Sequence, residues 1–219
     1  MADLITAIAA LLGAIVWPAL FLIVIIMFRT PLKAFVSNMS QFSVKAPGIE
    51  ASASRLQAAA ALGAATQRQA SASEGAESPT DVAQIAQALP DERQERGMMG
   101  ATVLWVDDNP NSSVYERRAL QAFGVSITGV LSTEEALSHL SVSTPDLVIS
   151  DMSRPPDPTA GFTLLDAMHQ SGYREPVIFY TGTATTEQVQ QARQRGALGL
   201  TNKPDDLLSM VVRVLGGRR

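Results

Sequence analysis

Five polar residue positions in this chain each follow a short apolar run, and their types suit phosphoryl chemistry. Asp107 and Asp108 follow Thr102–Val106, Asp151 follows the run that starts at Leu147, Thr181 follows Val177–Tyr180, and Lys203 follows Leu198–Thr201. Three carboxylates that converge on one spot raise one another's pKa unless a cation neutralises them. Mg²⁺ is the natural cation, because it binds carboxylates together with water and phosphate oxygens. A carboxylate facing such an ion, with an ammonium and a hydroxyl nearby, can attack a phosphoryl group and become an aspartyl phosphate.

The elements that must position these residues are short strands alternating with amphipathic helices. From Thr102 onward this alternation is typical of βαβ units and a parallel sheet, an α/β fold. In such a sheet ligands bind beyond the carboxyl ends of the strands, where all five residues fall. The sequence predicts strands over 102–106, 125–130, 147–149, 177–180 and 198–201, and helices over 111–123, 133–140, 161–169, 185–195 and 204–215. Glycine follows three of these helices, at Gly124, Gly172 and Gly196, as a left-handed helix end prefers.

The order of these groups resembles the receiver domain of two-component response regulators, over roughly residues 101–217. The resemblance rests on Val-Leu-Trp-Val-Asp107-Asp108, Leu-Val-Ile-Ser-Asp151, Phe-Tyr-Thr181-Gly and Thr-Asn-Lys203-Pro. It implies a flavodoxin-like (βα)5 fold for residues 101–219.

The resemblance also implies a role for each group. Asp107 and Asp108 look like metal-binding acids and Asp151 like the phosphorylated aspartate and a third metal ligand, with the backbone carbonyl of Ser153 as a fourth. Thr181 looks like the switch hydroxyl and Lys203 like the lysine that pairs with the phosphate. The implied cofactor is Mg²⁺. The implied partners are a histidine kinase or phosphotransfer protein as donor, and an effector protein that the sequence does not name.

Three positions depart from the family pattern. The loop over 152–160 is long and proline-rich, Leu200 stands where the family has an aromatic residue, and Asp205 stands where an apolar residue is usual. Arg154 in the long loop is read as a solvated charge. An alternative to the phosphoryl acceptor is therefore a phosphorylation-inactive receiver that serves as a scaffold, and a metal-dependent phosphohydrolase ranks last. We expect no enzymatic activity, and, since no output domain follows the receiver, signalling by protein contact.

The N-terminal residues 1–28 read as a transmembrane helix. Leu4 to Phe28 carry no charge, and at about 1.5 Å per residue they can cross a hydrocarbon layer of roughly 30 Å. Arg29, Lys33 and Lys45 follow the run, so the positive-inside rule places the receiver domain in the cytoplasm. We expect a single-pass protein of the cell membrane.

Residues 29–100 read as a juxtamembrane amphipathic helix and a mostly flexible linker. An apolar stripe at helical spacing is formed by Leu32, Phe35, Val36 and Met39. We expect this stripe to lie on the membrane surface or to pair with a second copy of the chain. The stretch 55–70 could be helical with a face of small residues, as a spacer or a weak self-association helix. Residues 71–100 hold one short helical candidate, Thr80 to Leu89.

Composition excludes several classes of function. The net charge is −4, with no basic cluster, so we expect no nucleic-acid partner. The chain has no cysteine, which excludes disulfide scaffolds, thiol catalysis and cysteine-ligated metal sites.

Overall fold

The computed structural model describes residues 47–72 and 82–218, which belong to one compact unit that begins at Pro47. The predicted transmembrane helix, 1–28, and the juxtamembrane stripe after it lie outside the described residues. Among the helices that are described, none has both the length and the apolar character needed to cross a membrane.

A parallel five-stranded sheet forms the centre of the unit, as the sequence predicts. The strands are β1 (Thr102–Val106), β2 (Ser126–Val130), β3 (Leu147–Ser150), β4 (Val177–Tyr180) and β5 (Gly199–Thr201), in the spatial order β2-β1-β3-β4-β5. Because β1 and β3 are neighbours, the first and third apolar runs end side by side. This order confirms the predicted flavodoxin-like topology.

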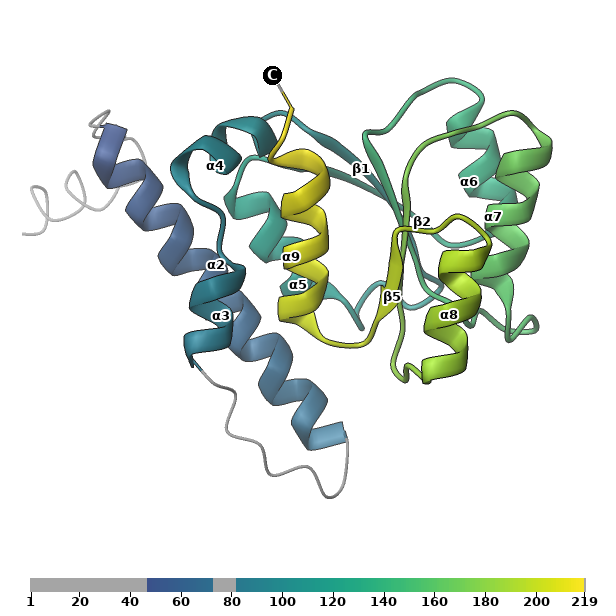
Figure 1. Cartoon of the computed structure of the whole chain (residues 1–219), viewed down its shortest axis with the longest axis horizontal. Helices are drawn as coiled ribbons and strands as arrows, with labels where there is room; N and C mark the ends of the chain where they lie inside the picture. The colour runs from purple at the N-terminus through teal and green to yellow at the C-terminus, as the bar shows by residue number, and fades with distance from the viewer. Residues whose placement is uncertain (1–46, 73–81, 219) are drawn as a thin grey trace, which may run out of the picture. The chain divides into compact units, whose positions relative to one another are not determined.

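Helices cover both faces of the sheet (Figure 1). One face carries α5 (Val114–Ala122) and α9 (Pro204–Leu215), and the other carries α6 (Thr133–Leu140), α7 (Ala160–Gln170) and α8 (Thr186–Gln194). Gly124, Gly172 and Gly196 have φ values of 76°, 85° and 92°, which confirms the left-handed helix ends predicted at these positions.

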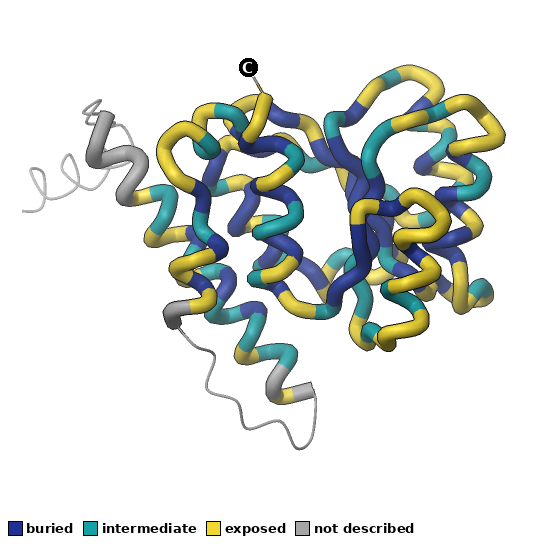
Figure 2. Tube along the Cα trace, in the orientation of Figure 1, coloured by how far each residue is buried: buried dark blue, intermediate teal, exposed yellow. Residues whose placement is uncertain are grey.

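The core has two halves because successive strand residues point to opposite faces. Val103 and Trp105 of β1 pack with α5 and α9, whereas Leu104 and Val106 pack with the opposite helices. Figure 2 shows the strands buried between exposed helix surfaces. Burial on both faces explains why the central strands read as continuous apolar runs instead of alternating ones.

Three further helices precede the sheet and form a layer outside α5 and α9 (Figure 1). They are α2 (Pro47–Ala72), α3 (Val82–Ala88) and α4 (Glu92–Met98). The interpretation of this region as a mostly flexible linker is therefore wrong for its described residues. The helical character expected for 55–70 and the short helix near 80–89 are confirmed by α2 and α3. Ala58, Leu62 and Ala65 lie on one face of α2 and are at most 1% exposed, because α2 packs along α5. Small side chains allow that close approach.

The contact of α4 with α9 depends on glycine. A Cβ atom on Gly97 would lie 2.6 Å from the carbonyl oxygen of Gly216, so only glycine permits this distance. Asp91 and Gln94 form a capping box at the start of α4, each side chain bonded to the other's backbone N–H. The folded unit therefore extends well before the expected boundary at residue 101.

Candidate functional site

The ends of β1 and β3 bring three carboxylates together. Val106 pairs with Ser150 in the sheet, so the next residues, Asp107 and Asp151, emerge at the same edge. One carboxylate oxygen from each of Asp107, Asp108 and Asp151 lies within 4.8 Å of the others. The convergence predicted from the sequence is confirmed for these three residues.

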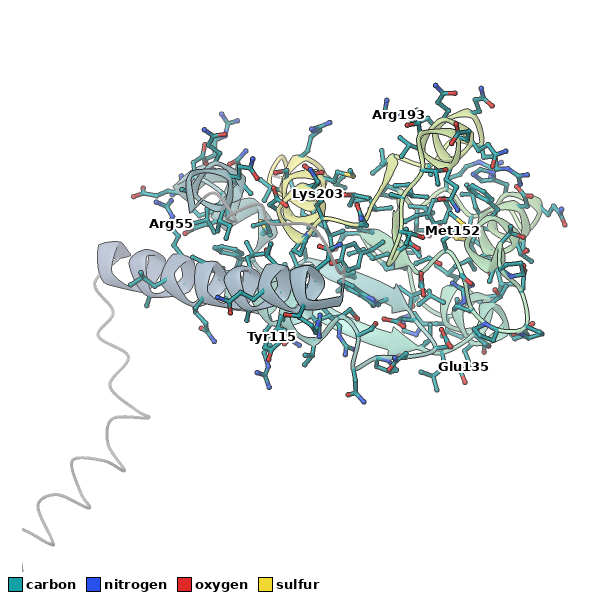
Figure 3. The ribbon with its side chains drawn as sticks, turned by 90° about the horizontal axis from the view of Figure 1, so that it is seen from below. Arg55, Tyr115, Glu135, Met152, Arg193 and Lys203 are labelled. Carbon is teal, nitrogen blue, oxygen red and sulfur yellow. The ribbon has the colours of Figure 1, made fainter. Side chains whose placement is uncertain are left out.

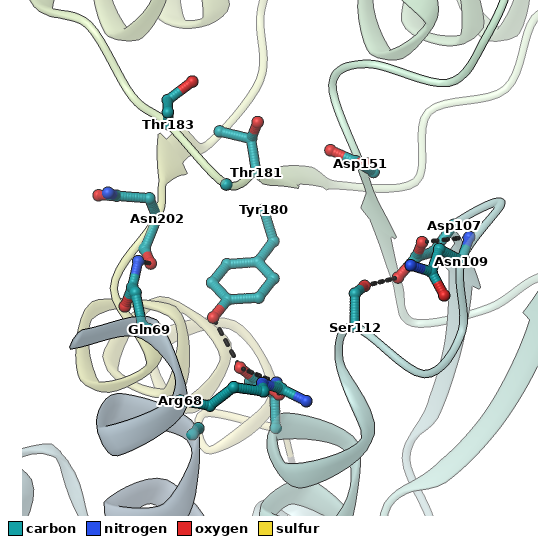
Figure 4. Close-up of a pocket in the computed structure, with 13 residues that line it drawn as sticks. Arg68, Gln69, Asp107, Asn109, Ser112, Asp151, Tyr180, Thr181, Thr183 and Asn202 are labelled. Atoms are coloured by element: carbon teal, nitrogen blue, oxygen red, sulfur yellow. Dashed lines mark hydrogen bonds and ion pairs between the residues drawn. The ribbon is translucent and has the colours of Figure 1, made fainter. Parts of the chain in front are cut away.

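Asp107 is held rigidly at the base of the site. It is 5% exposed, and its Oδ1 accepts a hydrogen bond of 2.8 Å from the backbone N–H of Asn109. Its Oδ2 accepts bonds from the hydroxyls of Ser112 and Ser113, at 3.0 and 2.9 Å. Three protein groups thus orient this carboxylate before any ligand arrives, as the dashed bonds in Figure 4 show in part.

The surroundings of Asp151 disfavour the charged form of its carboxyl group. Burial raises the pKa of its carboxyl above the ordinary value of 3.8, and the neighbouring charge of Asp107 raises it further. The backbone N–H groups of Ser153 and Met152 and the charge of Arg154 lower the pKa in part. The ionised form of Asp151 is therefore destabilised, and a nearby cation would stabilise it.

The donor set fits Mg²⁺. Three carboxylates at the end of a parallel sheet offer hard oxygen ligands and leave room for water and a phosphate. Asp107 would hold the ion from the buried side, and Asp108 from the exposed side. The contact recorded for Ser153 is made by its N–H, 3.4 Å from Oδ1 of Asp151. The role of its carbonyl as a ligand stays a prediction.

Thr181 shares a cavity with the acids. This cavity has a volume of about 610 Å³, and Asp107, Asp151 and Thr181 all line it (Figure 4). Thr181 is half-buried at the end of β4, where its N–H bonds to the carbonyl of Thr201 at 3.1 Å. The strand therefore fixes the backbone of Thr181, and Thr181 lines the same cavity as Asp151, as predicted.

Lys203 does not join the acids in this structure. Its side chain is exposed, and it lines a different hollow together with Asp205 and Asp206. In Figure 3 Lys203 and Met152, the residue after Asp151, lie apart. The expected approach of the ammonium to the carboxylates is thus not observed. Lys203 follows β5 in the chain, as predicted, but its flexible four-carbon side chain can contact residues other than the three acids.

The opposite wall of the cavity comes from α2, which the sequence reading did not include in the site. Ala65, Arg68 and Gln69 line it. The guanidinium of Arg68 lies 3.1 Å from the Glu116 carboxylate, which is 3% exposed, and donates to the carbonyl of Asn111 at 3.1 Å. The side-chain amide of Gln69 donates to the carbonyl of Asn202, beside Lys203.

Glu116 links this wall to the end of β4. The hydroxyl of Tyr180 donates a hydrogen bond of 2.7 Å to Glu116. Burial and the charge of Glu116 raise the pKa of Tyr180, so the phenol stays protonated as a donor. Tyr180 is followed by Thr181, so α2, α5 and the end of β4 form one bonded chain that reaches the cavity.

Comparison with known proteins agrees with this geometry. A family model described as the response regulator receiver domain matches residues 103–214, about half of the chain, and that range contains every acid of the cluster, Thr181 and Lys203. The chain belongs to the response regulator receiver domain family.

The curated relatives match about half of this chain. It is 33% identical over 106 residues to the DNA-binding transcriptional regulator NtrC of Klebsiella pneumoniae, a match that covers 48% of this chain and 22% of that protein. It is 32% identical over 111 residues to an uncharacterized 14.6 kDa protein of Leptolyngbya boryana, covering 50% of this chain and 83% of that protein. The chain thus spans about a fifth of the length of NtrC.

A solved structure is similar to about half of this chain. The chemotaxis response regulator CheY4 of Vibrio cholerae is 30% identical, covers 52% of this chain and 98% of its own, and gives a TM-score of 0.45.

The prediction that Arg154 is exposed to solvent is wrong. Arg154 was expected to be a solvated loop charge, yet it is 4% exposed. The sequence offered one signal for this burial, which is a basic residue three positions after Asp151 in a proline-rich loop. Its burial follows from contacts with α6 and α7, which no local pattern reveals.

Proposed function

We propose that this receiver domain accepts a phosphoryl group on Asp151, with Mg²⁺ bound by Asp107, Asp108 and Asp151, and passes the signal on by protein contact. The single observation that carries the proposal is the convergence of these three carboxylates within 4.8 Å, in a domain of the receiver family. The donor would be a phosphohistidine of a histidine kinase or phosphotransfer protein, and the effector a protein not yet identified. We do not propose that the protein is an enzyme with a turnover of its own.

Each group has a defined task in this reaction. An oxygen of the Asp151 carboxylate attacks phosphorus, an O–P bond forms, and the N–P bond of the donor breaks with its electron pair on the histidine nitrogen. The hydroxyl of Thr181 would donate to a phosphoryl oxygen. Bound Mg²⁺ would offset the charge of the carboxylates and of the phosphoryl group.

Lys203 can take part in this reaction only if its side chain moves. Its side chain would leave the hollow beside Asp205 and Asp206 to pair with the added phosphate, which carries a charge of about −1.5 to −2.

The position of Lys203 favours a second candidate function. A receiver whose lysine stays outside the cavity would serve as an inert scaffold that recruits a partner. This candidate predicts no Mg²⁺ affinity and no response to loss of Asp151.

Labelling by acetyl phosphate separates the two. We expect the full chain to incorporate phosphate only when Mg²⁺ is present, and Asp151→Asn to remove at least nine-tenths of the label, because amide nitrogen and oxygen cannot form the acyl phosphate. Asp166→Asn, at a half-buried position on α7, is the matched control and should label normally. Equal labelling of wild type and Asp151→Asn would refute the acceptor proposal.

We further propose that Leu4 to Phe28 anchors the protein in the cell membrane with the receiver domain in the cytoplasm. The support is the uncharged length of this run and the basic residues that follow it.

A further inference from the structure

Arg154 is a buried cation beside the acceptor. It lies in the loop between β3 and α7, and only 4% of it is exposed. Arginine is rarely buried to this extent without partners, because removing its charge from water is costly. The environment of this guanidinium therefore requires an explanation.

Four oxygens surround the guanidinium. One terminal nitrogen donates to Oγ of Ser150 at 2.6 Å and to the backbone carbonyl of Asp151 at 2.7 Å. The other donates to Oγ1 of Thr133 at 2.9 Å and to the backbone carbonyl of Ala160 at 3.0 Å. The end of β3 and the starts of α6 and α7 are thus tied together by one side chain, whose planar fork suits such a set of acceptors.

All four acceptors are uncharged, so the compensating charge comes from further away. Burial lowers the pKa of Arg154, and the carboxylates of Asp151 and Asp108 are the largest opposing influence. Arginine keeps its proton in proteins. Arg154 is therefore a permanent positive charge behind the carboxylate cluster.

The bond to the carbonyl of Asp151 has a geometric consequence. Fixing this carbonyl limits rotation of the acceptor's backbone and so limits where its side chain can point. The same loop carries the N–H of Ser153, which faces Oδ1 of Asp151 at 3.4 Å. Arg154 also pairs through its backbone with Asp157, with N–H to carbonyl distances of 3.0 and 2.9 Å. Arg154 thereby holds the loop over 152–160 through contacts with Asp151 before it, Asp157 within it and Ala160 at its end.

We propose that Arg154 is the positioning residue of the acceptor site: by holding the Asp151 carbonyl and the proline-rich loop, it aims the Asp151 carboxylate at Asp107 and Asp108. This inference rests on the proposed function of the site. The unusual loop after the acceptor is then part of the site's construction, with Arg154 as the group that folds it inward.

The test measures Mg²⁺ affinity of the full chain by titration calorimetry. Arg154→Lys keeps the charge but cannot bond four oxygens through one ammonium, and Arg154→Met removes both charge and bonds. We expect both variants to raise the Kd for Mg²⁺ by about tenfold or more, as is typical when a group that orients a metal ligand is lost. Arg118→Lys, an exposed position on α5, is the matched control and should bind as wild type does.

The two variants distinguish geometry from charge. If Arg154 acted only as a positive charge, its removal would make Mg²⁺ bind more tightly in Arg154→Met and leave Arg154→Lys unchanged. A Kd in Arg154→Met equal to or below that of wild type would therefore overturn the proposal. A role in fold stability alone would lower the melting temperature and leave the Kd unchanged when it is measured well below that temperature, and this result would overturn it as well.

Hydrogen exchange in metal-free protein gives a readout independent of the ion. We expect the N–H of Asp157 and of Gly161, which bonds to the carbonyl of Met152 at 3.0 Å, to exchange at least tenfold faster in Arg154→Lys. Thr133→Val, which removes one acceptor of the guanidinium at a site away from the acids, should show a smaller change in the same direction. Unchanged exchange in both variants would contradict the proposal.

Failure of this inference and failure of the proposed function are distinguishable. If wild type binds no Mg²⁺ and takes up no phosphate, the acceptor function fails, whatever the exchange data show. If wild type does both and the Arg154 variants match it, only the positioning role fails.

Discussion

At Asp151 the fold holds a carboxylate in a place that disfavours its charge. The residue is withdrawn from water and faces Asp107, so its pKa is raised. A site that binds a divalent cation gains from this arrangement, because the ion relieves repulsion that already exists. The same repulsion lowers the stability of the metal-free protein.

Replacing this carboxylate should therefore stabilise the metal-free fold. A carboxyl whose folded pKa is raised contributes stability below its unfolded pKa of about 3.8, and that contribution is lost as pH rises through the folded value. At pH 7 in the presence of EDTA, we expect Asp151→Asn to melt about 2 °C higher than wild type. The difference should shrink as pH falls towards 4, because wild-type Asp151 then becomes neutral as well.

Thermal unfolding over a pH series provides the measurement. Asp166→Asn should give no gain at any pH, since the Asp166 side chain is 47% exposed and paired with Arg195 at 2.6 Å. A wild type that is as stable as Asp151→Asn at pH 7 without metal would contradict the assigned repulsion.

At the scale of elements, α2 is part of the domain and of its cavity. Its buried face packs on α5, and its last turns are bonded to the loops after β1 and β5 through Asn111 and Asn202. Both loops flank the acceptor cavity. The polar anchor of this arrangement is the pair of Arg68 with the buried carboxylate of Glu116.

Breaking that pair should destabilise the fold. Arg68→Met leaves Glu116 buried with the Tyr180 hydroxyl and no cation, and loss of one partner of a buried pair typically costs several kcal/mol. Because the Arg68 side chain is 35% exposed, we expect a smaller loss of about 2 kcal/mol in urea unfolding. Adding Glu116→Gln should recover part of the loss, since the buried charge is then gone.

Arg55→Met is the matched control on the same helix. Arg55 pairs with Glu95, whose side chain is 12% exposed compared with 3% for Glu116, so its loss should cost less than about 1 kcal/mol. Equal losses of unfolding free energy for Arg55→Met and Arg68→Met would show that the burial of Glu116 does not determine the size of the loss.

At the scale of the whole molecule, the compact unit begins at Pro47 and not at the first strand. Met98, Ile85 and Leu62 belong to the same core as Trp105 and Leu120. A fragment that starts at residue 101 would expose the faces of α5 and α9 that these residues cover. A fragment of residues 47–219 keeps that core whole.

The anchor proposal can be tested with this boundary. We expect the full chain to sediment with membranes and to resist extraction by high salt, and the fragment of residues 47–219 to stay in the supernatant with cooperative unfolding, because only residues 1–46 contain the uncharged run. A fragment starting at 101 should be less stable or aggregate. Release of the full chain by salt alone would contradict a spanning anchor.

The sequence by itself determined the sheet and the meeting of the acids. Strands such as β1 and β4 were predicted with their observed bounds, because apolar runs bounded by polar residues are a local signal. The convergence of Asp107, Asp108 and Asp151 followed from the parallel order of the strands, whose carboxyl ends meet at one edge.

Only the tertiary structure decided what surrounds that edge. Residues distant in sequence decide the burial of Arg154, the exposed position of Lys203 and the packing of α2. Arg68 and its partner Glu116, for example, are 48 positions apart in the sequence. Long polar side chains can reach several neighbours, and a helix face of small residues carries a weak apolar signal. Local pattern therefore fixes where the backbone ends a strand, whereas the partners of these side chains are set when the layers pack together.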